Sequence, residues 1–181
     1  MKKLLAVICL FTVGLSAQPF SDSTSFARPA TNATAYANGD IVATSDSLGI
    51  LRFTKFGKSS FNRGYITAGG VEVDTASTAG GFRLWLFKDT TDFAKVADNA
   101  AWTAPAAMMA TQLIGFIDFN LSSSGIGAGA GGNADWVTNL NIPYEEVGSR
   151  GIYGRIAVTS AHTPKAGGRF KVVLKAHALV R

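Results

Sequence analysis

The chain has few of the side chains on which enzymes and metal sites depend. Its 181 residues include one cysteine and two histidines, and only 16% are charged. Cys9 has no second cysteine with which to form an internal disulfide, and one cysteine with two distant histidines supplies too few ligands for a zinc site. No G-x-S-x-G segment, the nucleophile signature of many hydrolases, is present. We therefore expect no enzyme activity, no catalytic residue, no metal and no cofactor.

One stretch formally matches a nucleotide-binding motif. Residues 127–132 read G-A-G-A-G-G, which contains G-x-G-x-x-G. A dinucleotide site needs a strand before this motif and a helix after it. The residues that follow, 133–138, predict a strand instead. We therefore interpret the glycine tract as a loop tip.

The titratable side chains show no catalytic spacing. His162 falls in an Ala-His-Thr-Pro turn, and His177 falls on the outward face of the last predicted strand. Glu145 and Glu146 are adjacent, so on a strand they point to opposite faces and do not converge as a glycosidase pair does. The aspartates between 89 and 98 lack the spacing of an EF-hand calcium loop. Solvated surface positions explain all of these residues.

Length and charge exclude further classes of protein. A chain of 181 residues with 47% hydrophobic content is long enough for one domain with a real core. The formal net charge is +5, and it falls to +3 when Lys2 and Lys3 are set aside. So small an excess of cations does not indicate a nucleic-acid partner.

The first 17 residues resemble a leader. Lys2 and Lys3 precede the apolar run Leu4–Leu15, and small residues follow it. About a dozen apolar residues are too few to cross roughly 30 Å of hydrocarbon, so we expect no membrane span in the mature protein. Two interpretations remain open. The segment is either a secretory signal that is cut after Ser16 or Ala17, or an apolar arm that is retained and packs on a neighbouring subunit.

Beyond residue 39 the pattern is that of strands separated by glycine- and proline-rich turns. Apolar and polar residues alternate with period two, most clearly in the last strand, where positions 170, 172, 174 and 176 are apolar. We predict strands at 40–44, 50–56, 65–74, 82–87, 113–119, 135–142, 151–159 and 169–177, and a short helical turn within 89–109. Eight strands predict an all-β, two-sheet sandwich of the jelly-roll type at 40–181, preceded by an extended arm or connector at 18–39.

The aromatic residues allow two interpretations. Trp85, Trp102 and Trp136, with several tyrosines, are suited to a sugar-binding platform on a sheet face. They are also suited to filling the core and subunit interfaces, because their large area and polar tip are both useful there. We favour the second interpretation. Residues 82–87 in particular are apolar on both faces apart from Arg83, which indicates a central strand or one that borders a subunit interface.

Several of these segments, in this order, resemble structural proteins of tailed bacteriophages. The resemblance begins at RPATNATAYANGD (28–40) and continues through FRLWLF (82–87), ADNAAW (97–102), IGFIDF (114–119), GIYGRIAVTSAHTP (151–164) and RFKVVLKAHAL (169–179). It spans about five-sixths of the chain. The chain departs from it by one extra residue in the opening motif and by the leader-like segment 1–17.

The resemblance implies a non-enzymatic β-sandwich of the virion that decorates the outside of a phage capsid. The implied partners are the major capsid protein and further copies of the chain, as a dimer or trimer. The alternative is a secreted module, with residues 1–17 cleaved, that binds glycans or another host-surface component. For the capsid or subunit interface we expect anchors in the arm and a basic row on the last strand: Phe26, Arg28, Pro29, Tyr36, Arg169, Lys171 and Lys175. Deletion of residues 1–38 is then expected to leave a folded sandwich that no longer binds the shell.

Overall fold

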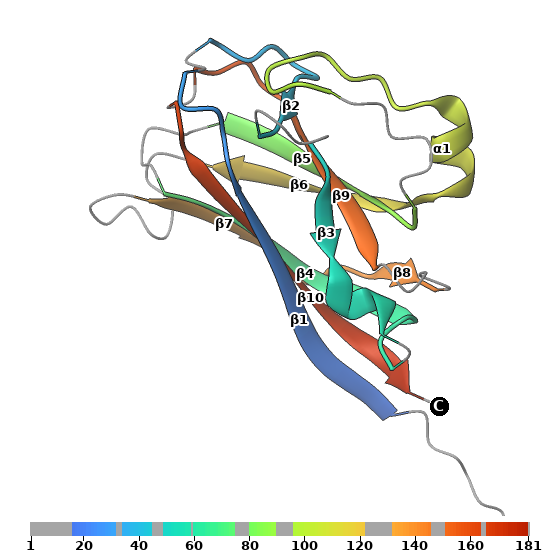
Figure 1. Cartoon of the computed structure of the whole chain (residues 1–181). Coiled ribbons are helices and arrows are strands. Elements are labelled where there is room, and N and C mark those ends of the chain that lie inside the picture. The colour runs from blue at the N-terminus through green and yellow to red at the C-terminus, as the bar shows by residue number, and fades with distance from the viewer. Residues whose placement is uncertain are drawn as a thin grey trace, which may run out of the picture.

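The computed structural model describes residues 16–31, 34–44, 49–58, 60–74, 80–89, 96–121, 132–145, 151–163 and 166–180. Within these ranges ten strands form two five-stranded antiparallel sheets. The sheets pack face to face as a β-sandwich (Figure 1). The predicted all-β fold is confirmed.

The strand order is that of a jelly roll. The first sheet has the order β1–β10–β4–β7, and β8 also pairs with β4; the second has the order β2–β9–β5–β6, and β3 also pairs with β9. The bounds of the first sheet are Ser16–Ala27 (β1), Arg169–Val180 (β10), Gly64–Val73 (β4), Asn133–Val137 (β7) and Ile142–Tyr144 (β8). Those of the second are Ile41–Val42 (β2), Leu51–Phe53 (β3), Ile152–Val158 (β9), Gly80–Phe87 (β5) and Leu113–Leu121 (β6). β2 and β3 both pair with β9, and β7 and β8 both pair with β4, so each of these two pairs fills one strand position. The described strands then occupy the eight positions of a jelly roll, which is built from two Greek keys.

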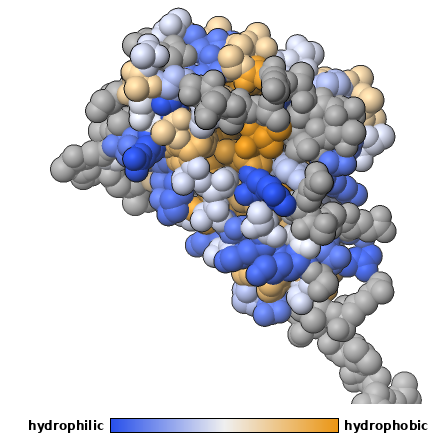
Figure 2. Space-filling view, viewed as in Figure 1, coloured by the Kyte–Doolittle hydropathy of each residue, from blue (hydrophilic) through white to orange (hydrophobic). Residues whose placement is uncertain are grey.

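The core lies between the two sheets and follows from the alternation in the sequence. On β10 the apolar residues Phe170, Val172, Leu174 and Ala176 are buried, whereas the cationic residues between them are exposed. The inward residues of β5 are likewise fully buried. Polar side chains gather on the outside over β1 and η1 (Thr54–Gly57), with an apolar area above them in the same view (Figure 2).

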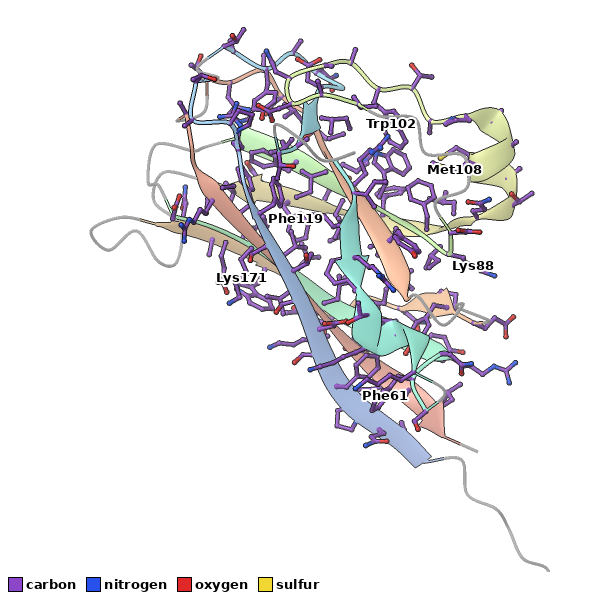
Figure 3. The ribbon with its side chains drawn as sticks, in the orientation of Figure 1. Phe61, Lys88, Trp102, Met108, Phe119 and Lys171 are labelled. Atoms are coloured by element: carbon purple, nitrogen blue, oxygen red, sulfur yellow. The ribbon has the colours of Figure 1, made fainter. Side chains whose placement is uncertain are left out.

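A second, smaller apolar layer covers part of the outer face of the second sheet. Residues 96–102 lie across this face, since the Ile41 N–H donates to the Ala100 carbonyl and the Trp102 N–H donates to the Gly39 carbonyl. Trp102 lies between this segment and the sheet (Figure 3). The cover explains why all seven residues of β9 are buried, including Arg155, whose guanidinium carbon is 4.8 Å from the centre of the Trp102 ring.

The structure differs from the expected arm at 18–39. Ser16–Ala27 forms the edge strand β1, which pairs with β10 in continuous register from Ser16 opposite Val180 to Ala27 opposite Arg169. The inward positions of β1 are not uniformly apolar, because Asp22 and Thr24 lie between Phe20 and Phe26. These polar positions and the serines around them hide the periodicity of the strand. The connection from β1 in the first sheet to β2 in the second is thus limited to residues 28–40.

Most predicted strands differ from the observed ones only by a few residues at their ends, but three other predicted elements differ in kind or in continuity. The strand expected at 135–142 is two strands, because Asn139 adopts a positive φ of 58° between β7 and β8. The strand expected at 50–56 gives way after Phe53 to the 3-10 turn η1. The helix expected within 89–109 is α1, Ala106–Thr111, which begins directly after Pro105. Proline suits the start of a helix because its missing N–H is not needed there.

Candidate binding surfaces

The motif at residues 28–40 builds a buried network of hydrogen bonds. Arg28 Nε donates to Tyr36 Oη at 2.5 Å, and Tyr36 Oη donates to Asp98 Oδ1 at 2.5 Å. Arg28 Nη2 forms an ion pair with Asp98 Oδ2 at 2.9 Å. Asp98 Oδ1 also accepts from the Ala43 N–H at 2.9 Å. Burial and the Asp98 carboxylate raise the pKa of Tyr36, so its hydroxyl stays protonated and donates.

This network contradicts part of the expected interface. Arg28 is 3% exposed and Tyr36 is 1% exposed, so neither side chain is available to a partner. Phe26 is half-buried and stacks on Phe170, with ring centres 5.4 Å apart. Pro29 is half-buried, and its carbonyl accepts from the Gly167 N–H. Through Arg28 and Tyr36, the motif connects the chain between β1 and β2 to Asp98 in the 96–102 segment.

The basic row is exposed as expected. Arg169, Lys171 and Lys175 point outward from β10, as does His177. In Figure 3 the side chain of Lys171 points away from the second sheet. Lys171 Nζ forms an ion pair with Glu72 of β4 at 2.9 Å, and both side chains are partly exposed. Such a pair contributes little stability.

Two aromatic residues extend this row across the first sheet. Trp136 on β7 is 37% exposed and Tyr65 on β4 is 39% exposed. Lys175 Nζ lies 4.7 Å from the centre of the Trp136 ring. The indole lies over Gly70, its register partner, which has no side chain in the way. A Cβ added at Gly70 would come within 2.6–2.7 Å of three indole atoms. We call this outer surface of the first sheet the basic face; it comprises Tyr65, Trp136, Arg169, Lys171, Lys175 and His177.

The outer face of the second sheet carries a different set of side chains. Where it is not covered, Trp85 lies opposite Phe116, Arg83 opposite Asp118 and Gly81 opposite Asn120 on β5 and β6. Phe116 is 44% exposed, the largest exposed fraction among the exposed large apolar residues that the structure describes. We call Arg83, Trp85, Phe116, Asp118 and Asn120 the aromatic face. The sequence suggested Trp85 but not the other four, because alternation predicts only that they point outward.

The remaining titratable candidates lie apart from one another. His162 is half-buried beside Tyr36 and Phe82, and burial lowers the pKa of its imidazole. Glu145 pairs with Arg63 at 2.8 Å on the surface, which lowers the pKa of the Glu145 carboxyl. Glu146, Asp92, Cys9 and residues 127–131 of the glycine tract lie outside the described residues. Among the residues that the structure describes, no three His, Cys, Asp or Glu side chains are grouped so that they can hold a metal ion.

No protein-family model matches the chain, and no curated protein matches it by sequence. The resemblance to tailed-phage proteins therefore stays a prediction. A search of solved structures finds similarity to a chain titled "Israeli acute paralysis virus heated to 63 degree - full particle", at 10% identity and a TM-score of 0.37. The match covers 99% of this chain and 77% of that one. The assignment of the jelly roll rests on the strand order of the chain itself.

The two faces are the surfaces from which a function can be argued. One is basic with two exposed aromatic rings, and the other is aromatic with an arginine and an aspartate. In the described part of the chain, no helix has the length and apolar character needed to cross a bilayer. The leader-like run at 4–15 lies outside that part, so both interpretations of residues 1–17 remain predictions.

Proposed function

We propose that the chain is a non-enzymatic structural protein of a virus particle, which binds the outside of a capsid shell and stabilises or decorates it. The observation that carries this proposal is the basic face. It is an exposed sheet surface with three cations, two exposed aromatic rings and two anions among the described residues beside them, Glu72 and Asp74. Aromatic and cationic residues on an exposed surface favour a protein partner of opposite charge.

The jelly-roll order and the resemblance of the sequence to virion proteins point in the same direction. Jelly rolls serve capsid proteins, lectins and cupins alike, so the fold alone does not select among these functions. The cupin interpretation requires a group of metal ligands, and the described residues offer none. Exposed ion pairs contribute only about 0–1 kcal/mol each. Firm attachment therefore requires several contacts at once, which a dimer or trimer of this chain supplies through avidity.

Composition of purified particles tests the proposal. We expect peptide mass spectrometry of virus particles, purified from the cells that express this chain, to find it in many copies for each set of major shell proteins. The N-terminal peptide read in the same experiment decides between a retained and a cleaved segment 1–17. Absence from particles, together with a mature chain in the culture supernatant, contradicts the proposal and favours a secreted binding module.

A charge reversal then tests the basic face. Lys175→Glu removes a cation that also lies on the Trp136 ring, and we expect it to lower the occupancy on particles stripped of the wild-type chain. Lys58→Glu is the matched control, because it changes the net charge equally at an exposed position at the end of η1. If the two variants occupy the stripped particles equally, the basic face is not the surface that attaches to the shell.

A further inference from the structure

The aromatic face has a feature that attachment to a shell does not require. Its two rings, Trp85 on β5 and Phe116 on β6, have centres 5.3 Å apart, and Trp102 of the covering segment extends them into a stripe, with its ring centre 6.4 Å from that of Trp85. Trp85 and Phe116 are cross-strand partners, so the sheet itself fixes their separation. Phe116 remains 44% exposed beside a covered apolar layer. A partly covered aromatic stripe of this kind marks a binding surface.

The polar side chains beside the stripe are held in place. Arg83 donates from Nε to Asp118 Oδ1 at 2.7 Å and from Nη2 to Asp118 Oδ2 at 2.8 Å. Arg83 also lies 4.1 Å from the Phe116 ring centre and 5.2 Å from the Trp85 ring centre. A guanidinium has five N–H donors and a carboxylate about four acceptor positions. The pair therefore keeps donors and acceptors for a ligand and presents them in a fixed orientation.

Two hollows lie on either side of this arginine. One, of about 170 Å³, is lined by Trp85 and Trp102 and by the polar edge Asn38 and Thr159. The other, of about 450 Å³, is lined by Asp118, Asn120 and Ser160 among others. Arg83 and Thr159 line both hollows, so the two hollows adjoin at these residues, and we call the pair of hollows the groove. The groove is thus apolar and aromatic at one end and rich in hydroxyl, amide and carboxylate groups at the other.

We propose that this groove binds neutral hexose saccharides. The apolar face of a pyranose ring stacks on Trp85, and its hydroxyls meet the Arg83–Asp118 pair, which can both donate and accept. Phe116 lines neither hollow and acts by positioning the Trp85 ring and the Arg83 guanidinium that it contacts. Among the residues that the structure describes, the charges that line the groove are Arg83, Asp118 and Asp135, one cation against two anions. That balance disfavours uronic and sialic acids and selects uncharged sugars. This inference goes beyond capsid attachment and does not depend on it, because Arg83, Trp85 and Asp118 of the groove lie on the second sheet, whereas the basic face lies on the first.

The test uses the full chain and a panel of neutral oligosaccharides, namely maltohexaose, cellohexaose and mannohexaose, with polygalacturonate as the acidic comparison. Calorimetric titration measures affinity, and the groove tryptophans report by fluorescence. We expect at least one neutral oligosaccharide to bind, and Phe116→Ala to weaken that binding by roughly tenfold. Asn120→Ala is a second variant, which removes an exposed amide and so leaves the fold intact. Trp136→Ala, on the basic face, is the aromatic control and retains saccharide binding.

Three results overturn the inference: no binding of any neutral oligosaccharide at millimolar concentration, stronger binding of polygalacturonate, or equal loss in Phe116→Ala and Trp136→Ala. A fourth is a change of oligomeric state in Phe116→Ala without any saccharide binding, which assigns the face to contact between copies of the chain. The outcome is separable from that of the capsid proposal. Phe116→Ala is expected to lose saccharide binding and to keep normal occupancy on particles. Lys175→Glu is expected to keep saccharide binding and to lose occupancy, so the two variants distinguish the two surfaces.

Discussion

Substitution of Tyr36 by phenylalanine tests whether the conspicuous N-terminal motif is structural. The change removes one oxygen and keeps the ring, which is 1% exposed and packs 5.4 Å from the His162 ring. It deletes the hydrogen bond that Tyr36 donates to Asp98 and the one that it accepts from Arg28. Both bonds involve a charged group inside the protein. We therefore expect a loss of stability without a change of surface.

The size of the loss follows from these two bonds. A hydrogen bond to a charged group contributes about 1.5–3 kcal/mol. Because the Arg28–Asp98 ion pair remains and relaxes into part of the space, we expect the free energy of unfolding to fall by about 3 kcal/mol, near the lower limit for two such bonds. For a chain of 181 residues this corresponds to a decrease in Tm of roughly 6–12 °C.

Urea unfolding followed by circular dichroism measures the change, with Tyr65→Phe as the control. Tyr65 is 39% exposed, so loss of its hydroxyl is expected to change stability by less than about 0.5 kcal/mol. A loss below about 1 kcal/mol in Tyr36→Phe refutes the reasoning. So does a variant of normal stability that no longer occupies particles, because that result makes Tyr36 an interface residue after all.

Two further predictions concern a glycine and a histidine. Gly70→Ala places a Cβ within 2.6–2.7 Å of the Trp136 indole. It is therefore expected to displace that ring and to lower the free energy of unfolding by about 1–3 kcal/mol. If the clash is the cause, the same change has no such cost in a chain that also carries Trp136→Ala. Burial lowers the pKa of His162 below its ordinary 6.5, so the folded state favours the neutral imidazole, and stability is expected to fall as the pH decreases below about 6.5. Urea midpoints between pH 5 and 8 measure this slope, which His162→Gln should reduce; an unchanged slope contradicts the assignment.

The fold could be predicted from the sequence wherever one face of a strand is uniformly apolar. Phe170, Val172 and Leu174 define the inward face of β10 without further information, and the cations between them define its outward face. The same rule fails for β1, where inward Asp22 is accommodated because its carboxylate accepts the Lys55 N–H at 2.6 Å. That partner is 33 residues away, so no local pattern predicts the bond.

The candidate sites show the same limit. The basic row could be predicted because it lies on a single strand. The aromatic face could not, since Trp85 and Phe116 meet only through the pairing of β5 with β6. The prediction that Arg28 and Tyr36 are exposed interface anchors was wrong for a related reason. An arginine and a tyrosine in an extended segment look like exposed anchors until Asp98, 70 and 62 residues away, is seen to accept from both.

Truncation of the N-terminus now has a different expected outcome from the one that an external arm implies. Deletion of residues 1–38 removes the whole of β1 and with it two phenylalanines whose rings pack on other rings of the domain. Phe20 lies 4.8 Å from Phe56 and 4.6 Å from Phe61, and Phe26 stacks on Phe170. Removal of a packed phenylalanine costs about 3 kcal/mol or more. The two together approach the total stability of about 5–15 kcal/mol of a typical domain.

We therefore expect the chain that starts at residue 39 to lack a cooperative thermal transition, whereas a control chain that starts at Ser16, and so keeps β1, melts as the full chain does. Differential scanning calorimetry distinguishes the two. A cooperative transition in the shorter chain at the Tm of the full chain contradicts this role for β1. Until that is measured, failure of a 1–38 deletion to bind particles cannot be attributed to a lost arm, because the variant is expected to lose the sheet that carries the basic face as well.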